Sequence, residues 1–564
     1  MSAWGHEAVV SASSLPLSGL RAVLAPSALR FYRALRHPEA AQAVCLQRVL
    51  RSAVGSVQAE RIPGFHRISD ARDFQAAVPW VTPDALTPDV ERIAAGEARV
   101  LTREPVLRFE LSGGSSGASK RVPMTRGLLA EFQRALAPML FELLHRRPAL
   151  REGASYWSIS PLARKQVRTA GGIPVGSAED SAYFSRVLRP LLSRIFAVPG
   201  EVGALPDVES CRYVTLWHLV AREDLSLISV WNPSFLTLLM DALERHGERL
   251  ADDLMRGHCR PPASGAAYDE AATQAVLDRM RFSPRPERAS LLREVLRGGW
   301  SARALWPRLS LLSMWTDAQA AHALPAACRR FPGVEVQGKG LLATEGVVTV
   351  PLFDAPAPVL AVRSHFFEFI DSEQPTSRPR LAHELEQGRT YTVLLSTSGG
   401  LLRYRLGDLV RVEGFQHATP CLRFVGRADA ICDLVGEKLA GTRVGAVLDA
   451  VLPDFFGGAR PGFSMLAPEW TPAPSYVLFL ETDAPASRLA AAAEAVEHAL
   501  CEGHHYRYAR ALGQLGPVRA VRVADGARRY EARCVALGQR AGDIKPVDLH
   551  RLTGWSDHFS GAAT

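Results

Sequence analysis

The chain has 564 residues, too many for one ordinary hydrophobic core, so we expect two or more domains. A hydrophobic content of 47% with 22% charged residues is typical of globular proteins and excludes a largely disordered chain. The net charge of +8 rests mostly on arginines that are interleaved with acidic residues along the whole chain, which argues against a nucleic-acid-binding protein.

The 8 cysteines stand singly and form no CxxC pair, so we predict neither a disulfide framework nor a zinc site and expect a cytoplasmic protein. The first residues lack a basic region followed by an apolar run, so no signal peptide is expected. The most apolar stretch, residues 213–240, is interrupted by Arg222, Glu223 and Asp224. It does not predict a membrane helix, which needs about 20 apolar residues in a row.

Helical patterns alternate with proline breaks in the first hundred residues. Residues 70–86 predict a helix that ends near Pro79 and a second start after Pro83. A strand is expected at residues 106–111 ("VLRFEL"), followed by the loop "SGGSSGASK". The next segment, residues 125–148, predicts an amphipathic helix with Thr125 as its N-cap. This helix would follow Lys120 and the loop directly.

Further elements follow in order along the chain. A strand is expected at residues 154–161 and a long helix at 233–255, and residues 390–415 predict a pair of strands that turns at Gly399 and Gly400. Near the end, "SYVLFLETD", "SRLAAAAEAVEHALCEG" and "VRAVRVAD" predict strand, helix and strand, which together form a small α+β unit. The glycine-punctuated, charged segment 424–441 is the expected domain boundary.

The loop within residues 111–125, "LSGGSSGASKRVPMT", has the composition of a phosphate-binding loop. Its glycines let the backbone approach an anion, Ser115 and Ser116 offer hydroxyl donors, and Lys120 offers a positive charge. It is not a Walker A loop, because Ser119 stands where that motif has glycine before the lysine. A flexible surface linker has the same composition, and the stretch alone leaves both interpretations open.

Three later motifs contain polar residues suited to a nucleotide site. Glu345 in "GLLATEG" could hold Mg²⁺, or it could be a surface carboxylate in a turn. Asp408 in "LLRYRLGDLV" could accept ribose hydroxyls from a tight turn, or it could belong to an ordinary β-turn. Lys545 in "GDIKPVDLH" is one of few lysines in an arginine-rich chain, which indicates a need for a compact ammonium.

The order of these motifs is more specific than any one of them. A Gly/Ser loop with Lys, then "ATEG", "YRLGD", "GRAD" and a terminal Lys resembles the series of the adenylate-forming superfamily. "SGGSSGASKRVPMT" and "RYRLGD" resemble the phosphate loop and the Y-R-x-G-D motif of the Gretchen-Hagen family of acyl acid amido synthetases, best known as auxin-responsive enzymes in plants. "YWSISP", "GGIPVGSAEDSAYF", "VWNPSFL", "HHYRYARALGQL" and "GQRAGDIKP" resemble bacterial members of that family.

This resemblance, which covers roughly residues 50–550, implies an α/β (mixed α+β) fold. A large N-terminal domain of β-barrel plus α/β subdomains, residues 1–426, would bind ATP and the acyl group, and a smaller mobile α+β domain would span residues 427–564. The implied enzyme is a ligase that uses ATP and Mg²⁺ to convert a carboxylic acid to acyl-AMP, releasing pyrophosphate. It then transfers the acyl group to an amine, typically that of an amino acid.

The resemblance also implies roles for individual residues. The contacts to the β- and γ-phosphates would come from Ser115, Ser116, Gly117 and Lys120. Around the rest of the nucleotide, Thr344 would contact the α-phosphate, Glu345 would be the metal ligand, Asp408 would bind the ribose, and Arg427 would contact phosphate or ribose. Lys545 would bridge the carboxylate and the α-phosphate, Asp429 would be the hinge, and the acyl pocket would contain Trp231, Asn232, Phe235 and Leu239.

One departure from the family pattern is Gly113, which stands where many relatives carry Ser or Thr, so loop contacts would fall more on neighbouring donors. For the pocket residues, ordinary core packing is an equally good interpretation. Two other functions share these motifs: an acyl-CoA ligase or an enzyme that loads a carrier protein, and a nucleotide-binding regulator without chemistry. The sequence predicts no nucleic-acid or membrane partner, and it does not identify the acid or the amine.

Overall fold

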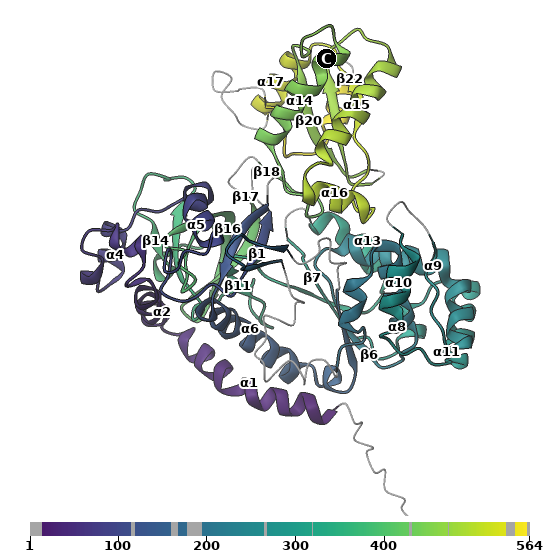
Figure 1. Ribbon diagram of the computed structural model, residues 1–564, viewed down its shortest axis with the longest axis horizontal. Helices are drawn as coiled ribbons and strands as arrows, with labels where there is room; N and C mark the ends of the chain where they lie inside the picture. Colours follow the sequence, from purple (N-terminus) through teal and green to yellow (C-terminus); the bar gives the residue numbers. More distant parts are fainter. Residues whose placement is uncertain are drawn as a thin grey trace, which may run out of the picture. The chain divides into compact units, whose positions relative to one another are not determined.

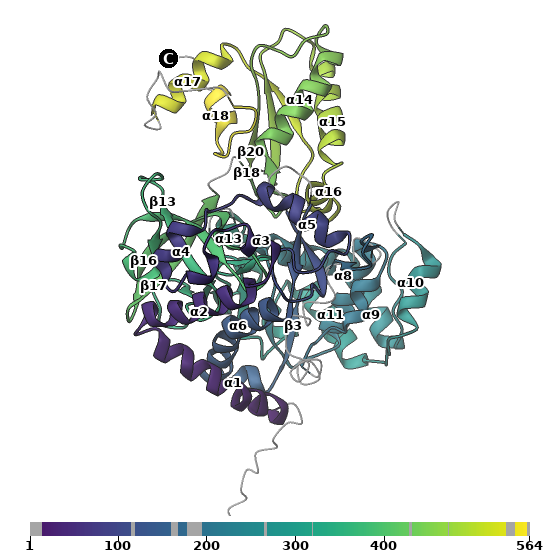
Figure 2. The same ribbon diagram turned by 60° about the vertical axis from the view of Figure 1, so that its left-hand side comes forward.

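The computed structural model describes residues 14–113, 119–158, 167–176, 195–263, 268–317, 320–427, 431–471, 473–536 and 547–560 (Figures 1 and 2). The chain divides into two compact units. The larger unit consists of Met1–Ser112, Arg121–Ala318 and Leu324–Gly426, and the smaller unit of Gly113–Lys120, Gln319–Ala323 and Arg427–Thr564. Both units combine helices and sheets around hydrophobic cores of their own, so the expected mixed α/β fold is confirmed.

The larger unit begins with short and medium helices. They are α1 (Ser14–Ala34), α2 (Pro38–Ala53), α3 (Val57–Glu60), η1 (Phe65–Arg67), α4 (Ala71–Ala77), η2 (Pro83–Leu86) and α5 (Thr87–Ala94). The Asp70 side chain accepts two backbone N–H groups at the start of α4, and the helix ends two residues before Pro79. The next helical turn starts at Pro83, so the predicted stop and restart are confirmed.

The long helix α6 (Arg126–Arg146) is also where the sequence predicted it. Thr125 is its N-cap, since the Oγ1 atom accepts the N–H of Leu128 at 3.2 Å. One face of α6 packs along α1 through a cluster that includes Leu20, Leu24, Leu136, Leu140 and Leu144, and the two helices lie side by side in Figure 1.

A strand separates the Gly/Ser loop from this helix, which the sequence did not predict. β1 (Arg108–Gly113) and β2 (Ser119–Met124) flank residues 114–118, and they join β4 (Val167–Arg168) and β5 (Pro174–Val175) in a sheet of order β2-β1-β5-β4. Val122 and Met124 are buried and pack in one hydrophobic cluster with Leu128 and Phe132 of α6, which holds the strand against the helix. Lys120 therefore lies in a strand, and the expected order of strand, loop, lysine and helix is corrected.

A four-stranded parallel sheet forms the next layer. Its order is β3-β6-β7-β8, with β3 (Ala154–Trp157), β6 (Leu225–Ser229), β7 (Leu311–Met314) and β8 (Glu335–Gly338). Its core includes residues of α8 (Val208–Val220), the predicted long helix α9 (Pro233–Arg256), α10 (Glu270–Leu277), α11 (Pro286–Gly298), α12 (Ala302–Leu305) and α13 (Ala320–Arg330). The short helices η3 (Pro148–Arg151) and η5 (Gly200–Ala204) precede β3 and α8.

A seven-stranded sheet completes the larger unit. Its order is β11-β12-β17-β16-β15-β13-β14, with β11 (Thr349–Val350), β12 (Val359–Leu360), β13 (Phe366–Asp371), β14 (Arg380–Leu381), β15 (Thr390–Ser396), β16 (Tyr404–Gln416) and β17 (Thr419–Arg427). A short helix, η6 (Ala382–Glu384), follows β14. β15 and β16 are antiparallel and turn at Gly399 and Gly400, as predicted. Gly400 is required there, since its φ is +97° and a Cβ would lie 2.6 Å from Leu101.

The smaller unit contains the predicted α+β elements. β20 (Ser464–Glu469), β21 (Ser475–Leu480) and β22 (Arg519–Arg522) form its sheet, and α15 (Ala486–Leu500) connects the parallel pair β21 and β22. The other elements are β18 (Ile431–Cys432), β19 (Leu439–Ala440), α14 (Gly441–Phe455), α16 (His504–Ala511), α17 (Gly526–Ala536) and α18 (Trp555–Ser560). The predicted strand, helix and strand are confirmed as β21, α15 and β22.

The cysteines are all free, and six of them are buried: Cys45, Cys211, Cys259, Cys421, Cys432 and Cys534. Among the helices that the structure describes, none is long and apolar enough to cross a membrane.

Candidate functional site

Thr344 and Glu345 form the two-residue turn between two short strands, β9 (Leu342–Ala343) and β10 (Gly346–Val347). Glu345 is only 7% exposed, whereas Thr344 is half-buried. Gly346 permits a close approach at this point, because a Cβ on it would lie 2.8 Å from Nε2 of His365. The turn is thus held against the buried interior of the larger unit, and Glu345 is not a surface carboxylate.

Asp408 lies inside strand β16, not in a turn as the sequence suggested. Thr392 pairs with Leu409 and Leu394 pairs with Arg405, so the three residues Leu406 to Asp408 lie opposite the single residue Val393. Gly407 has a φ of +84° in this bulge, a conformation that favours glycine. The glycine of "YRLGD" therefore creates an irregularity in the strand that redirects the next side chain, and Asp408 is 5% exposed.

A hydrogen bond connects the two motifs. Tyr404, the first residue of β16, donates its hydroxyl to Oε1 of Glu345 over 3.3 Å, and both side chains are buried. Tyr404 is also bridged to Val81, since the N–H of Val81 donates to Arg403 and the N–H of Arg405 donates to Val81. The "ATEG" and "YRLGD" motifs, about 60 residues apart in the chain, thus meet at one place in the larger unit.

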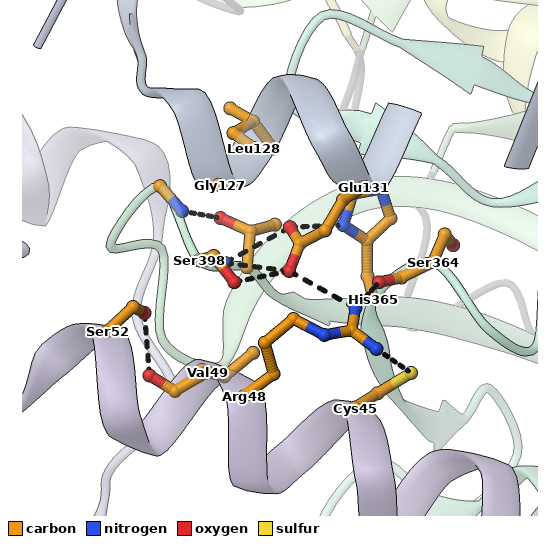
Figure 3. Close-up of polar contacts among 12 residues, drawn as sticks. Cys45, Arg48, Val49, Ser52, Gly127, Leu128, Glu131, Ser364, His365 and Ser398 are labelled. Atoms are coloured by element: carbon orange, nitrogen blue, oxygen red, sulfur yellow. Dashed lines mark hydrogen bonds and ion pairs between the residues drawn. The ribbon is translucent and has the colours of Figure 1, made fainter. Parts of the chain in front are cut away.

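A buried network holds β10 from behind the motif (Figure 3). Glu131 on α6 and His365 are both completely buried, and the His365 Nδ1 atom lies 3.0 Å from the Glu131 carboxylate. Nε2 of His365 accepts the backbone N–H of Val347 at 3.1 Å. Because Nε2 accepts a hydrogen bond, the ring proton lies on Nδ1 and is donated to Glu131. This chain of contacts fixes the strand that follows Glu345.

The same carboxylate also fixes the turn between β15 and β16. Glu131 accepts the backbone N–H of Ser398 at 3.1 Å and its hydroxyl at 2.5 Å (Figure 3). Arg48 lies 3.8 Å from Glu131 and donates to the carbonyl of Ser364 at 3.0 Å. One side chain on α6 therefore connects the segments that carry both motifs, and this role was not predicted from the sequence.

Arg403 anchors the start of β16 in a second buried ion pair. Its φ is +47°, its Nε atom donates to Glu368 over 3.0 Å, and its Nη1 atom donates to the carbonyls of Gln75 and Val78. Burial raises the pKa of Glu368, and the guanidinium of Arg403 acts in the opposite direction. The residue next to Tyr404 is thereby fixed on both its backbone and its side chain.

The predicted acyl-pocket residues lie at and below the carboxyl edge of the parallel sheet. Trp231 follows β6, and its carbonyl accepts the N–H of Trp315 at 2.8 Å. Asn232 is 6% exposed and precedes α9. Leu239 is 1% exposed within the hydrophobic core, and Phe235 packs against the same core. Core packing accounts for the burial of these last two, and their role in a pocket stays a prediction.

Several predicted site residues lie outside the described part of the chain. They are Ser115, Ser116, Gly117, Asp429 and Lys545. Lys120 is half-buried in β2, and the backbone of Arg427 ends β17. The structure therefore joins the Thr344–Glu345 turn to the start of the strand that carries Asp408, and the roles of all the nucleotide-binding residues stay predictions.

Sequence reasoning also missed Lys339, which follows β8 and lies among tryptophans at the same sheet edge as Trp231. The scarcity of lysine, which singled out Lys545, was a usable signal, because Lys120, Lys165, Lys339, Lys438 and Lys545 are the lysines among 66 basic residues. Glu131 and His365 stand in segments without a recognisable motif, and no pattern in the sequence indicated that they meet.

Profiles of one family match most of the chain. The GH3 family N-terminal domain matches residues 28–336, the central domain residues 358–427, and the C-terminal domain residues 460–551. The chain belongs to the GH3 family. The resemblance that the order of motifs indicated is confirmed at the level of the family.

Relatives of this GH3 chain include plant proteins. It is 28% identical over 451 residues to the probable indole-3-acetic acid-amido synthetase GH3.12 of Oryza sativa subsp. japonica, covering 72% of each chain. It is 23% identical over 393 residues to the indole-3-acetic acid-amido synthetase GH3.3 of Arabidopsis thaliana, covering 66% of this chain and 65% of the relative. The structure of the GH3.15 acyl acid amido synthetase superposes with a TM-score of 0.63 and 19% identity over 96% of both chains, which shows a shared fold.

Proposed function

We propose that this GH3 chain is an ATP-dependent acyl acid amido synthetase. Its plant relatives and the superposed structure are named as amido synthetases. The observation that carries the proposal is the meeting of the two nucleotide motifs. Tyr404 joins the Glu345 turn to β16, which presents Asp408 from a bulge, within the fold of this family. The likeness of five sequence segments to bacterial members supports a bacterial origin, and the cysteines that stand singly support a cytoplasmic enzyme.

In the first half-reaction, a carboxylate oxygen attacks the α-phosphorus of ATP. A new P–O bond forms, the bond to the β-phosphate oxygen breaks, and pyrophosphate leaves with the electron pair. Because an anion attacks an anion, positive charge and hydrogen-bond donors must surround the phosphates. Lys120 and Lys545 supply charge in this proposal, and the donors come from the phosphate loop (Ser115, Ser116, Gly117).

In the second half-reaction, an amine nitrogen attacks the acyl carbon. The C–N bond forms, the C–O bond to AMP breaks, and the nitrogen loses a proton. The acceptor is proposed to be an amino acid. The residues that orient the nucleotide through both steps are Thr344 at the α-phosphate, Asp408 at the ribose, and Arg427 at phosphate or ribose. In this proposal, residues 1–426 bind ATP and the acyl group, and residues 427–564 move about a hinge at Asp429.

Glu345 fits the ligand chemistry of Mg²⁺. Among the described residues, no group of three or more His, Cys, Asp or Glu side chains is placed to hold a metal ion by itself. Nucleotide-bound Mg²⁺ does not need such a group, because it is typically held by one or two carboxylates together with phosphate oxygens. Bound there, the ion would neutralise charge on the phosphates. Glu345, held at the tip of a tight turn, offers such a carboxylate.

The alternative functions differ in the second step. An acyl-CoA ligase, or an enzyme that loads a carrier protein, would share the adenylation step and use a thiol instead of an amine. The family match and the names of the plant relatives favour an amine acceptor. A regulator that only binds nucleotide would keep the fold but release no pyrophosphate.

The test is acid-dependent release of pyrophosphate across aryl, indolyl and fatty acids, followed by separate supply of amino acids, CoA and a carrier protein. We expect an amide product with an amino acid. Glu345→Gln should lower Mg²⁺-dependent kcat about a hundredfold while acid binding is kept, because the uncharged amide is a weaker metal ligand. The matched control is Glu248→Gln, whose side chain is 66% exposed. Absence of any acid-dependent pyrophosphate from the folded wild type would overturn the proposal.

A further inference from the structure

Arg134 on α6 carries a positive charge that is buried without an acceptor. Its Nε and Nη2 atoms have almost no contact with solvent and donate to no acceptor in the part of the chain that the structure describes. Burial lowers the pKa of this guanidinium, and the charge of Arg48 lowers it further. A buried charge without a hydrogen-bonding partner is costly, so packing alone does not account for this side chain.

Three other arginines lie around Arg134. Arg48 on α2 donates to the carbonyl of Ser364 at 3.0 Å, which places it beside Arg363. Arg363 reaches α1, since its Nη1 atom lies 3.5 Å from the carbonyl oxygen of Ser27. Arg30 stands one turn further along that helix, and its charge and that of Arg48 both act on Arg363. We call Arg30, Arg48, Arg134 and Arg363 the arginine cluster.

Hydrophobic packing fixes the segments that carry the arginine cluster. Phe31, Ala135 and Val362 belong to one buried hydrophobic group, and each is the direct neighbour in sequence of a member of the cluster. On α2, Gln42 donates to the carbonyl of Val362 at 2.9 Å. The four guanidinium groups come from α1, α2, α6 and the segment before β13, which therefore cannot move apart to relieve their repulsion without opening the core.

The neighbouring acidic groups do not balance this charge. The carboxylate that acts on Arg134 is that of Glu131, one turn earlier on α6, and it already accepts hydrogen bonds from His365 and Ser398 (Figure 3). Cys45 stays a neutral thiol, because burial raises its pKa to about 11. The surroundings of the arginine cluster therefore hold more positive than negative charge.

An anion with several oxygen atoms has the chemistry to complete this arrangement. Guanidinium groups bind phosphate oxygens through pairs of N–H donors, and they stay charged near neutral pH. The excess of positive charge favours an anion with two or more negative charges. Because two nitrogen atoms of Arg134 are buried, a ligand that reaches them has to be small, which favours a free phosphate anion over a nucleotide.

We propose that the arginine cluster is a binding site for a small multivalent phosphate anion, such as inorganic phosphate or pyrophosphate. This inference goes beyond the proposed function, because none of the four arginines is among the predicted nucleotide or acyl residues. Arg48 connects the site to the buried network, since it lies 3.8 Å from Glu131 (Figure 3). An anion bound there acts on the carboxylate that fixes the turns of both nucleotide motifs.

Thermal unfolding of the full-length protein without Mg²⁺ tests the site, with sodium pyrophosphate, phosphate and ADP each compared with chloride at equal ionic strength. Pyrophosphate at about a hundred times its Kd should raise the midpoint by about 3 °C. Arg134→Met should have a higher midpoint than wild type in chloride, because an unpaired buried charge is removed, and it should lose the effect of pyrophosphate. A lower midpoint in chloride with an unchanged effect of pyrophosphate would make Arg134 a structural residue and overturn the inference.

Two further variants keep the test independent of Arg134. Arg363→Met removes a member of the cluster from another segment, so it tests the same site even if Arg134→Met does not fold, and it should also lose the effect of pyrophosphate. Arg33→Met is the matched control, because Arg33 lies exposed on α1 and the change removes the same charge. It should respond to pyrophosphate as wild type does.

Lys120→Met distinguishes the arginine cluster from the phosphate loop proposed for ATP. It should weaken stabilisation by ADP and keep stabilisation by pyrophosphate, whereas Arg134→Met should do the reverse. If the effect of pyrophosphate disappears in Lys120→Met and persists in Arg134→Met, the anion binds at the nucleotide site and the inference is wrong. Equal midpoints of wild type in pyrophosphate and in chloride would also overturn it.

Discussion

The parallel and the antiparallel sheet of the larger unit contribute to the proposed site in different ways. The parallel sheet places Lys339 and tryptophans at its edge simply because its strands end together, above an apolar core. The antiparallel sheet presents Asp408 only through a bulge, and the turn with Glu345 depends on a buried polar network behind it. Strand topology alone thus forms the part of the proposed site on the parallel sheet, whereas the part on the antiparallel sheet requires specific buried side chains.

Glu131→Ala should give the largest effect if the antiparallel half depends on the buried network. The change leaves the Nδ1–H of His365 and the N–H of Ser398 without their acceptor in the core. Removing one member of a buried charged network costs about 3–5 kcal/mol. Urea denaturation of the full-length protein, followed by circular dichroism, measures this loss in the free energy of unfolding.

The matched control on stability is Glu248→Ala, because that side chain is 66% exposed and its ion pair with Arg293 should contribute less than about 1 kcal/mol. If Glu131→Ala and Glu248→Ala lowered the free energy of unfolding equally, the antiparallel sheet would not depend on its buried network more than the parallel sheet does.

Leu239→Ala tests whether the parallel half is an apolar core beneath its edge. Leu239 is 1% exposed in the core of this subdomain. Truncation of such a leucine destabilises by about 2–5 kcal/mol through lost burial and the cavity that remains. We expect a lower midpoint of unfolding, and the KM for the acid stays unchanged if Leu239 serves only as core. A higher KM in a protein of normal stability would instead place Leu239 in the acyl pocket.

Asp408→Ala should act on nucleotide affinity and leave the fold intact, because the bulge at Gly407 presents the carboxylate and its proposed partner is the ribose. Loss of hydrogen bonds to a charged group costs about 1.5–3 kcal/mol, or roughly tenfold to a hundredfold in the KM for ATP. Initial-rate kinetics measure this, with the exposed Asp252→Ala as the control. Unchanged ATP affinity in a folded variant would contradict the ribose assignment.

Tyr404→Phe should have the smallest effect. It removes the hydroxyl that joins the two motifs and keeps the buried ring. The hydrogen bond to the carboxylate is long, at 3.3 Å, so it should contribute no more than about 1.5 kcal/mol, and the Mg²⁺ midpoint should shift only about two- to tenfold. A Mg²⁺ titration of pyrophosphate release provides the value. A loss as large as that of Glu345→Gln would mean that Tyr404 does more than orient the carboxylate.

Most long elements could be predicted from the sequence, because their signals are local. The Asp70 cap, the prolines after α4, Thr125 before α6 and the apolar period of α9 each lie within a few residues of the helix that they define. Strand β2 was missed because its six residues stand between a glycine-rich loop and a strong helix signal. Residues 119–124 were assigned to the loop, whereas the start of the helix at Thr125 was correct.

The site was predicted where it consists of motifs and missed where it consists of long-range contacts. Glu345 and Asp408 were found from short patterns. The contact between Glu131 and His365 joins residues 234 positions apart, and nothing in either segment specifies the other. The bulge at Gly407 was read as a turn, because glycine before aspartate favours both and only the pairing with β15 distinguishes them.

The buried cysteine thiols of each unit can report how often that unit opens locally. Burial raises the pKa of Cys45 and of Cys421 in the larger unit to about 11, and it also raises the pKa of Cys432 in the smaller unit. The thiolate is the form that attacks an alkylating reagent, so these residues react only when their surroundings open. Peptide-resolved labelling of the unmodified protein can therefore time the fluctuations of the two units separately, without a single introduced probe.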